Sequence, residues 1–196
     1  MALGLLYLGL TLLGILKIQA QNPPPALHLN PPLYKVPVQP DFQDDQFQGR
    51  WYAIAVADNA IRFENLTQLD MYNMIFQLKD NHGYNVTYAV FSEDYCELWR
   101  TAFVPNIQPG QYTLENMTSF TGVQSHVFRV ITTDYNNFAV IFVKILYKDR
   151  IYFESVLLGR GKELDPTLQE SFLDFAKSLG LTEDDVIVTY PTGNVQ

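Results

Sequence analysis

The chain has 196 residues, of which 47% are hydrophobic, and 13 Lys or Arg against 21 Asp or Glu give a net charge of −8. This length fits a single domain with a sizeable core. The acidic balance argues against nucleic acid or anionic lipid as a partner, because both carry negative charge.

Residues 1–20 are typical of a secretory signal peptide. The apolar run from Leu3 to Leu16 is too short to span a bilayer, and Ala20 supplies a small residue at the cleavage position. We therefore expect a secreted, extracellular protein of about 176 residues after cleavage. A retained membrane anchor is the alternative, but no basic stop-transfer flank follows, so we expect no membrane insertion.

Three Asn-x-Ser/Thr sequons agree with secretion, since none has Pro in the middle position. Asn85 is the favoured site, because it follows the turn-like sequence Asn81-His82-Gly83. The expected glycosylation sites are Asn65, Asn85 and Asn116.

Residues 21–41 form a proline-rich arm without hydrophobic periodicity, densest at Pro23-Pro24-Pro25. This composition is typical of an extended or partly disordered segment. The folded domain is therefore expected to occupy residues 42–196.

Eight runs rich in Val, Ile, Tyr and Phe follow the arm, with Gly, Asn, Asp and Pro between them. Their nearly regular spacing predicts an antiparallel barrel or sandwich. The expected strands are 50–57, 71–78, 84–91, 98–104, 111–114, 123–132, 138–146 and 151–158.

One helix is expected near the end of the chain. Asp165 is a good N-cap, Pro166 suits the first helical position, and Gly180 can end the helix. Because apolar residues recur on one face, we expect this face to pack against the outside of the sheet. These residues are Leu168, Phe172, Phe175, Ala176 and Leu179.

Three short motifs occur in a fixed order: Gly49-x-Trp51, Thr133-Asp134-Tyr135 and Gly159-Arg160. Together they resemble the lipocalin family. The resemblance implies an all-β fold with one C-terminal α-helix, namely an eight-stranded antiparallel up-and-down β-barrel around a ligand cavity. It also implies that Arg160 stacks on Trp51 at the barrel base. The residues with structural roles would be Gly49, Trp51, Thr133, Asp134, Tyr135 and Arg160.

Strand alternation within such a barrel selects a mostly apolar inner face, with Thr101, His126 and Glu154 as its polar groups. It predicts a small hydrophobic ligand of the odorant, pheromone or lipid type, carrying one donor or basic nitrogen. A one-residue bulge would instead turn Arg100 inward. The expected ligand-binding residues are Tyr72, Trp99, Thr101, Phe103, His126, Phe128, Val143, Ile145, Tyr152, Glu154 and Leu158.

Further segments, including 42–52 and 177–181, are similar to one branch of the family that sequesters ferric siderophores. The resemblance implies an Arg and two Lys as siderophore ligands, at positions where this chain has Thr101, Ile145 and Glu154. We therefore expect no useful affinity for ferric catecholates. Innate-immune siderophore capture through other polar groups stays an alternative, as does action through a cell-surface receptor.

Glu154 has three interpretations, because an inward carboxylate is costly unless it is paired or hydrated. It could lie at a solvated mouth, bonded to Tyr152 or Thr101. It could anchor an amine-bearing ligand, or it could pair with His126.

Cys96 is the one cysteine. The resemblance implies a disulfide to the C-terminal region, but 189–196 contain no cysteine, so burial, capping or a Cys96-linked dimer are the alternatives. We expect a monomer. Some family members isomerise prostaglandins through a cavity thiol, yet Cys96 falls at a strand entry, and the three histidines lack metal-type spacing. We expect no enzyme activity, metal or cofactor.

Overall fold

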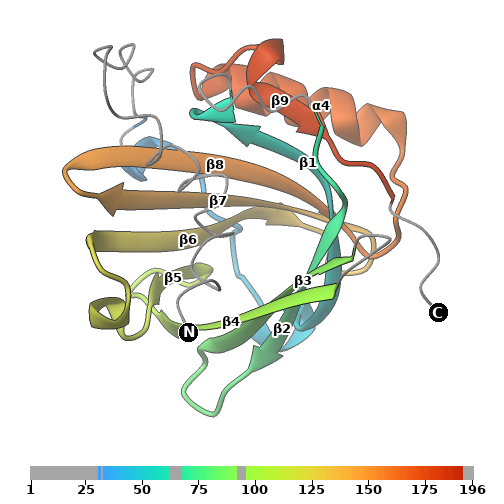
Figure 1. Cartoon of the computed structure of the whole chain (residues 1–196). Helices are drawn as coiled ribbons and strands as arrows, with labels where there is room; N and C mark the ends of the chain where they lie inside the picture. The colour runs from blue at the N-terminus through green and yellow to red at the C-terminus, as the bar shows by residue number, and fades with distance from the viewer. Residues whose placement is uncertain (1–30, 32, 62–67, 92–95, 192–196) are drawn as a thin grey trace.

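Eight strands form a closed antiparallel barrel (Figure 1), in which each strand pairs with the next and β1 pairs with both β2 and β8. The computed structural model describes residues 31, 33–61, 68–91 and 96–191, so the predicted signal peptide and Asn65 lie outside the described residues. The predicted up-and-down barrel with a C-terminal helix is confirmed. Its strands are β1 (Gly49–Asp58), β2 (Tyr72–Leu78), β3 (Tyr84–Phe91), β4 (Cys96–Pro105), β5 (Gln111–Leu114), β6 (Val123–Thr133), β7 (Phe138–Tyr147) and β8 (Arg150–Gly159).

Several short elements fall outside the sequence prediction, because three or four residues show no recognisable periodicity. One of them, β9, pairs antiparallel with Ala55, Val56 and Ala57 of β1 and extends the sheet to nine strands. These elements are η2 (Leu33–Lys35), α2 (Asp44–Phe47), η3 (Met117–Ser119), η4 (Glu183–Asp185) and β9 (Val186–Val188).

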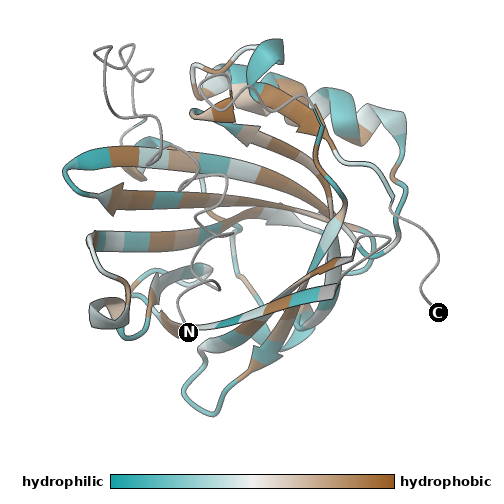
Figure 2. Cartoon of the chain, in the orientation of Figure 1, coloured by the Kyte–Doolittle hydropathy of each residue, from teal (hydrophilic) through white to brown (hydrophobic). Residues whose placement is uncertain are grey.

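The barrel wall separates two apolar layers, one inside the barrel and one outside it. Successive side chains of a strand point to opposite faces, so Ile141 and Val143 belong to the inner layer and Phe142 to the outer one. Hydrophobic and hydrophilic segments alternate along several barrel strands in Figure 2. Both faces of β7 and β8 are largely apolar because the outer face is also covered.

Helix α4 (Pro166–Ser178) supplies that cover (Figure 1). The Asp165 carboxylate accepts a hydrogen bond of 2.9 Å from the Thr167 amide at its start, and Gly180, with φ +88°, follows its end. Phe172 and Ala176 are buried in the outer layer. The predicted apolar stripe therefore lies against the outer wall of the barrel.

The described part of the proline-rich arm, residues 33–41, lies along the outside of β6. The Gln39 amide donates to the Val130 carbonyl at 2.9 Å, and Val36 is 2% exposed. The Arg129 guanidinium donates to the carbonyls of Leu33 and Val36 and to the Gln111 side chain. Sequence composition predicts an extended arm, and these contacts fix part of it on the barrel.

The three family-like motifs meet at the base of the barrel. The Arg160 guanidinium carbon lies 3.6 Å from the centre of the Trp51 ring, and Trp51 is fully buried. Arg160 also donates to the carbonyls of Tyr135 at 2.9 Å, Arg50 at 2.9 Å and Gln46 at 3.1 Å. Since these carbonyls belong to three separate segments, one side chain joins the N-terminal entry of β1 to the β6–β7 turn.

Three further motif residues shape the same end. The Asp134 carboxylate accepts hydrogen bonds from the amides of Asn136, Asn137 and Phe138, which fixes the turn between β6 and β7. Thr133 contributes a hydroxyl that donates to the Phe138 carbonyl at 2.8 Å. Gly49 has φ +91°, and a Cβ there would lie 3.3 Å from Arg160, so glycine suits this position for two reasons.

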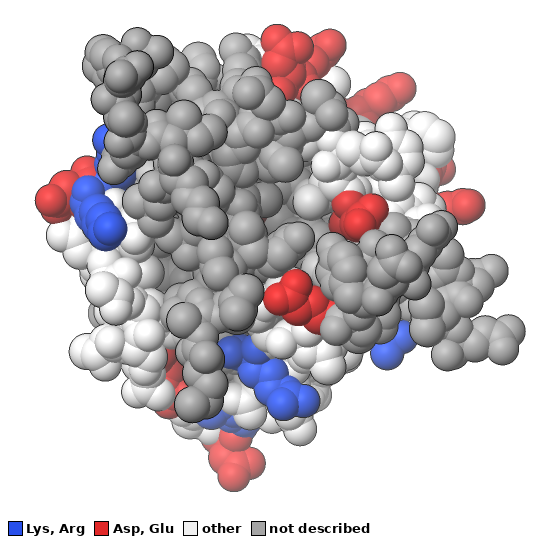
Figure 3. Space-filling view, viewed as in Figure 1, with Lys and Arg blue, Asp and Glu red and all other residues white. Residues whose placement is uncertain are grey.

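The molecular surface is described only in part. Figure 3 shows acidic and basic side chains scattered among uncharged ones on the described part of one face, without a continuous basic area there. Within the described ranges, no helix has the length and apolarity needed to cross a membrane.

The base contacts predict a large loss of stability when Arg160 is replaced. Arg160→Met keeps much of the apolar stem but removes the stacked cation and three hydrogen bonds, so we expect the free energy of unfolding to fall by about 2–4 kcal/mol. Urea denaturation measures the change. Arg100→Met, on the exposed face of β4, is the matched control and should change stability by less than about 0.5 kcal/mol. A similar loss in both variants would contradict the role of the base contacts.

Candidate functional site

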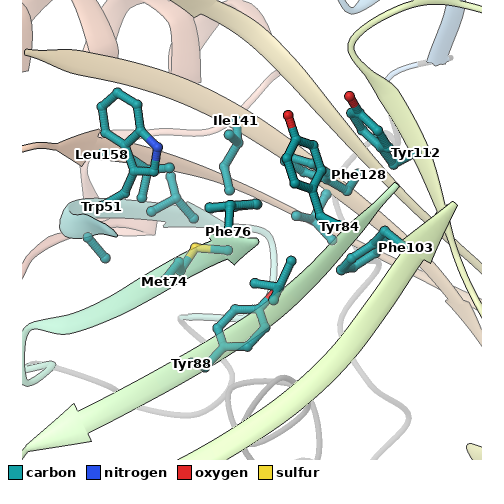
Figure 4. Close-up of a cluster of buried hydrophobic side chains, with 14 of the residues drawn as sticks. Trp51, Met74, Phe76, Tyr84, Tyr88, Phe103, Tyr112, Phe128, Ile141 and Leu158 are labelled. Carbon is teal, nitrogen blue, oxygen red and sulfur yellow. The ribbon is translucent and has the colours of Figure 1, made fainter. Parts of the chain in front are cut away.

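Aromatic rings fill the part of the barrel interior that lies toward its base (Figure 4). Phe76 on β2 and Phe128 on β6 come from opposite walls, and their ring centroids are 5.7 Å apart. Phe128 also stacks on Tyr112 at 5.4 Å, and Phe103 lies 5.6 Å from Phe128. Because rings from opposite walls touch here, we call this level the aromatic floor of the barrel. A guest molecule would have to lie between this floor and the mouth, which is the open end of the barrel near the β7–β8 turn.

The residues predicted to bind a ligand all lie on the inner face, at different heights. Phe103 and Phe128 belong to the floor, and Leu158 packs in the same inner cluster. The buried residues of the inner wall include Trp99, Val143, Ile145 and Tyr152. Tyr72 packs against this wall and is partly buried. Arg100 is exposed on the outer face of β4, so the alternative in which it points inward does not occur.

Tyr88 is an inner-wall residue that the sequence prediction omits. It is the cross-strand partner of both Met74 and Trp99 and is 7% exposed. In Figure 4 it lies along β3 away from the floor residues Tyr84 and Tyr112. Alternation along β3 could have identified it, since Tyr84, Val86 and Tyr88 occupy every second position.

Two polar atoms of the inner face have no hydrogen-bond partner among the residues that the structure describes: His126 Nε2 and Thr101 Oγ1. His126 is 5% exposed, and its ring meets that of Phe103 edge-on with centroids 5.3 Å apart. Burial lowers the pKa of His126 to about 4, so the imidazole is neutral at pH 7. A neutral imidazole and a hydroxyl can each donate or accept a hydrogen bond from a guest.

A bulge in β1 changes which of its residues point inward. The register against β8 shifts between Ala53 and Ala55, so that Ala53 and Val56 both belong to the inner layer, whereas Ala55 and Ala57 belong to the outer one. Asp58 follows Val56 by two positions and therefore points inward. Without the bulge, it would face outward.

Asp58 is the direct cross-strand partner of Glu154, so two carboxyl groups lie side by side on the inner wall. Asp58 is 1% exposed and accepts a hydrogen bond from the Ala60 amide. Burial raises the pKa of Asp58; the Ala60 amide opposes this rise and Asp185 adds to it. Burial raises the pKa of Glu154 as well, and the neighbouring Asp58 adds to that rise. Thr101 Oγ1 and His126 Nε2 have no hydrogen-bond partner among the described residues, so the expected pairing of Glu154 with either atom is not found there.

Tyr72 and Tyr88 face the two carboxyl groups from β2 and β3. Burial raises the pKa of both phenols, and the charge of Glu154 raises each of them further. Both therefore keep their O–H group as a donor at neutral pH. Arg150 begins β8 with the same strand parity as Glu154, but in the described part of the chain no ion pair joins them.

The remaining predicted sites lie on the outside or beyond the described residues. Asn85 is exposed on β3, and Asn116 is exposed at a turn with φ +57°. Cys96 begins β4, but its side chain is outside the described part of the structure.

Comparisons with known proteins agree on one family. Residues 48–193 match the model of the lipocalin / cytosolic fatty-acid binding protein family. The chain is 47% identical over 191 residues to neutrophil gelatinase-associated lipocalin of Homo sapiens, covering 97% of this chain and 96% of that protein. It is 31% identical over 188 residues to prostaglandin-H2 D-isomerase of Mus musculus, covering 95% and 93%. The solution structure of lipocalin 12 from rat epididymis is similar with a TM-score of 0.74 and 27% identity, covering 82% of this chain and 91% of that one.

The carboxyl pair predicts a pH-dependent cost to stability. Both pKa values are raised in the folded state, so folding favours the protonated forms, and stability is lost as pH rises from the unfolded pKa of about 4 through the folded values. We expect Asp58→Asn and Glu154→Gln each to raise the free energy of unfolding by about 1–3 kcal/mol at pH 8, with the gain shrinking toward pH 4. Urea denaturation across this pH range measures it. Glu170→Gln, exposed on α4, should leave the pH profile unchanged; identical profiles for all variants would contradict the prediction.

Proposed function

This chain belongs to the lipocalin / cytosolic fatty-acid binding protein family, and from that premise we propose that it is a secreted carrier of a small hydrophobic molecule. Barrels of this family bind small hydrophobic molecules in their interior. The inner wall above the aromatic floor has the composition of such a site, since it is aromatic and aliphatic with a few polar groups. An odorant, a pheromone or a compact lipid fits that composition.

The observation that carries the proposal is a pair of buried atoms, His126 Nε2 and Thr101 Oγ1, for which the described residues supply no hydrogen-bond partner. Leaving a buried polar group without a hydrogen bond costs about 1–3 kcal/mol. A guest that bonds to either group recovers that free energy while burying its apolar body against Trp99 and Val143. Binding inside the barrel therefore accounts for polar atoms that folding leaves unsatisfied.

Secretion and a soluble carrier role are parts of the same proposal. The signal-like residues 1–20 motivate it, and Asn85 and Asn116 are both exposed, as glycan acceptors need to be. A monomeric state, a Cys96-linked dimer and a cell-surface receptor remain predictions.

We propose binding without catalysis, although the isomerase among the relatives shows that an enzyme can be similar to this chain. His126, the one histidine on the described inner wall, has a pKa lowered to about 4 and no hydrogen-bond partner at Nε2 that would orient it. It is thus poorly suited to act as a general acid at neutral pH.

A larger side chain on the inner wall above the aromatic floor should weaken the binding of a hydrophobic guest. We expect the neutral fluorescent probe N-phenyl-1-naphthylamine to bind with a dissociation constant in the micromolar range or below. Thr101→Phe adds a large side chain to the inner wall and should weaken binding at least about tenfold. Thr132→Phe, on the exposed face of β6, is the matched control and should leave the affinity unchanged. Fluorescence titration measures both, and equal affinities would place the probe outside the barrel.

Ferric siderophore capture is less favoured by the inner wall. Thr101, Ile145 and Glu154 all face inward as neutral or acidic groups, and Asp58 adds a second carboxyl. A multiply charged anion such as ferric enterobactin would meet repulsion in a poorly solvated interior. We therefore expect no saturable quenching of tryptophan fluorescence by ferric enterobactin below about 10 μM, where binding would correspond to about −7 kcal/mol. Micromolar or tighter binding would refute the charge argument.

A further inference from the structure

Asp58 and Glu154 place two acidic groups on one stretch of inner wall. They are direct cross-strand partners on the same face, a relation in which Cβ atoms are typically about 4.5–5.5 Å apart. Like charges in this relation are destabilising, and burial increases the cost. Of the described residues, none makes an ion pair with either group. Among the described residues, nothing neutralises the pair, so a proton or a cationic guest would relieve the repulsion.

The groups around the pair suit a cation with an attached apolar body. Tyr72 on β2 and Tyr88 on β3 are close enough for the charge of Glu154 to raise their pKa values. Their rings offer π faces, which attract ammonium groups. Trp99, the cross-strand neighbour of Tyr88, extends this aromatic surface.

An independent observation points to a guest in the same interior. His126 is 5% exposed on the inner face, and its Nε2 has no partner among the described residues. It lies on β6, next to Ile145 of β7, and Ile145 is in turn paired with Tyr152 of β8, two residues from Glu154. A hydrogen-bonding group on the guest could thus reach His126 while another part of the guest reaches the carboxyl pair.

We propose that the ligand of this barrel is an amphipathic amine: a compact apolar molecule whose protonated nitrogen is held between Asp58 and Glu154, with its body against Tyr72, Tyr88 and Trp99. This inference rests on the proposed function and adds a substrate class to it. It also accounts for two carboxyl groups in a wall that is otherwise apolar.

Binding of the amine should depend on pH, because only an ionised carboxylate attracts it. Affinity should rise between pH 5 and pH 8 as the carboxyl pair loses protons, and binding should release protons. The other titratable groups that face the pair or lie at its rim do not reverse this trend: Tyr72 and Tyr88 stay protonated, His126 stays neutral, and Asp185 is a further acid. These groups are Tyr72, Tyr88, Glu97, His126, Arg150, Tyr152 and Asp185.

The test compares two molecules that share one apolar body: 2-(1-naphthyl)ethylamine, which is cationic, and 2-(1-naphthyl)ethanol, which is neutral. Each displaces N-phenyl-1-naphthylamine from the full secreted protein at pH 7.5. We expect the amine to bind about ten- to a hundredfold more tightly, the range of one charge-assisted hydrogen bond. In the double variant Asp58→Asn/Glu154→Gln the amine should lose its advantage, so that the two affinities become equal.

Asp149→Asn is the control, since this exposed acid lies in the β7–β8 turn near the mouth and outside the inner wall. It should preserve the preference for the amine. Equal affinity of the amine and the alcohol for the unmodified protein would overturn the inference and leave the proposed function standing. Loss of the preference in Asp149→Asn would also overturn it, because general surface charge would then be the cause. Failure of the neutral probe and of both naphthyl compounds to bind would overturn the proposed function together with the inference.

Discussion

The structure depends on closure of the sheet by β1. Its first residues, Gly49 to Tyr52, pair with β2, while the stretch from Tyr52 to Asp58 pairs with β8. Toward the mouth β1 leaves β2, and β9 takes the edge from Ala55 to Ala57. Closure is thus completed near the base, where Arg160 ties β1 to the β6–β7 turn. The separation of the inner apolar layer from the outer one follows from this arrangement.

Closure also separates the interior into two parts of different chemistry. Near the base, Phe76, Tyr112 and Phe128 meet across the barrel and leave a packed hydrophobic floor. Nearer the mouth, the wall carries His126, Asp58 and Glu154, whose hydrogen bonds and charges the described residues balance only in part. Because the surrounding wall is apolar, each of these polar groups interacts more strongly with a guest than it would in water. The upper part can therefore be selective even though few polar groups are present.

Much of this architecture was predictable from the sequence, since eight β-rich runs, the capped helix at Asp165 and three family-like motifs specify the barrel. Alternation on β4 and β8 placed Thr101 and Glu154 on the inner face. Alternation failed on β1, because Ala53, Ile54, Ala55 and Val56 are apolar on both faces and no polar residue marks the outer side. The outer face there is covered by the outer apolar layer around α4, so the bulge has no signature in composition. Asp58 was missed for this reason, and with it the acidic neighbour of Glu154.

The contact between Phe76 and Phe128 also limits the shape of what the protein can carry. Phe76 lies opposite Gly49 at the start of β1, so these rings close the barrel axis toward its base, and a guest can enter only from the mouth. An acyl chain longer than the distance from the mouth to this contact would have to fold back on itself or leave its tail in solvent. Branched, cyclic or fused-ring molecules have no such difficulty, because their bulk is spread sideways. The position of this contact thus sets the length of cargo that the barrel can enclose.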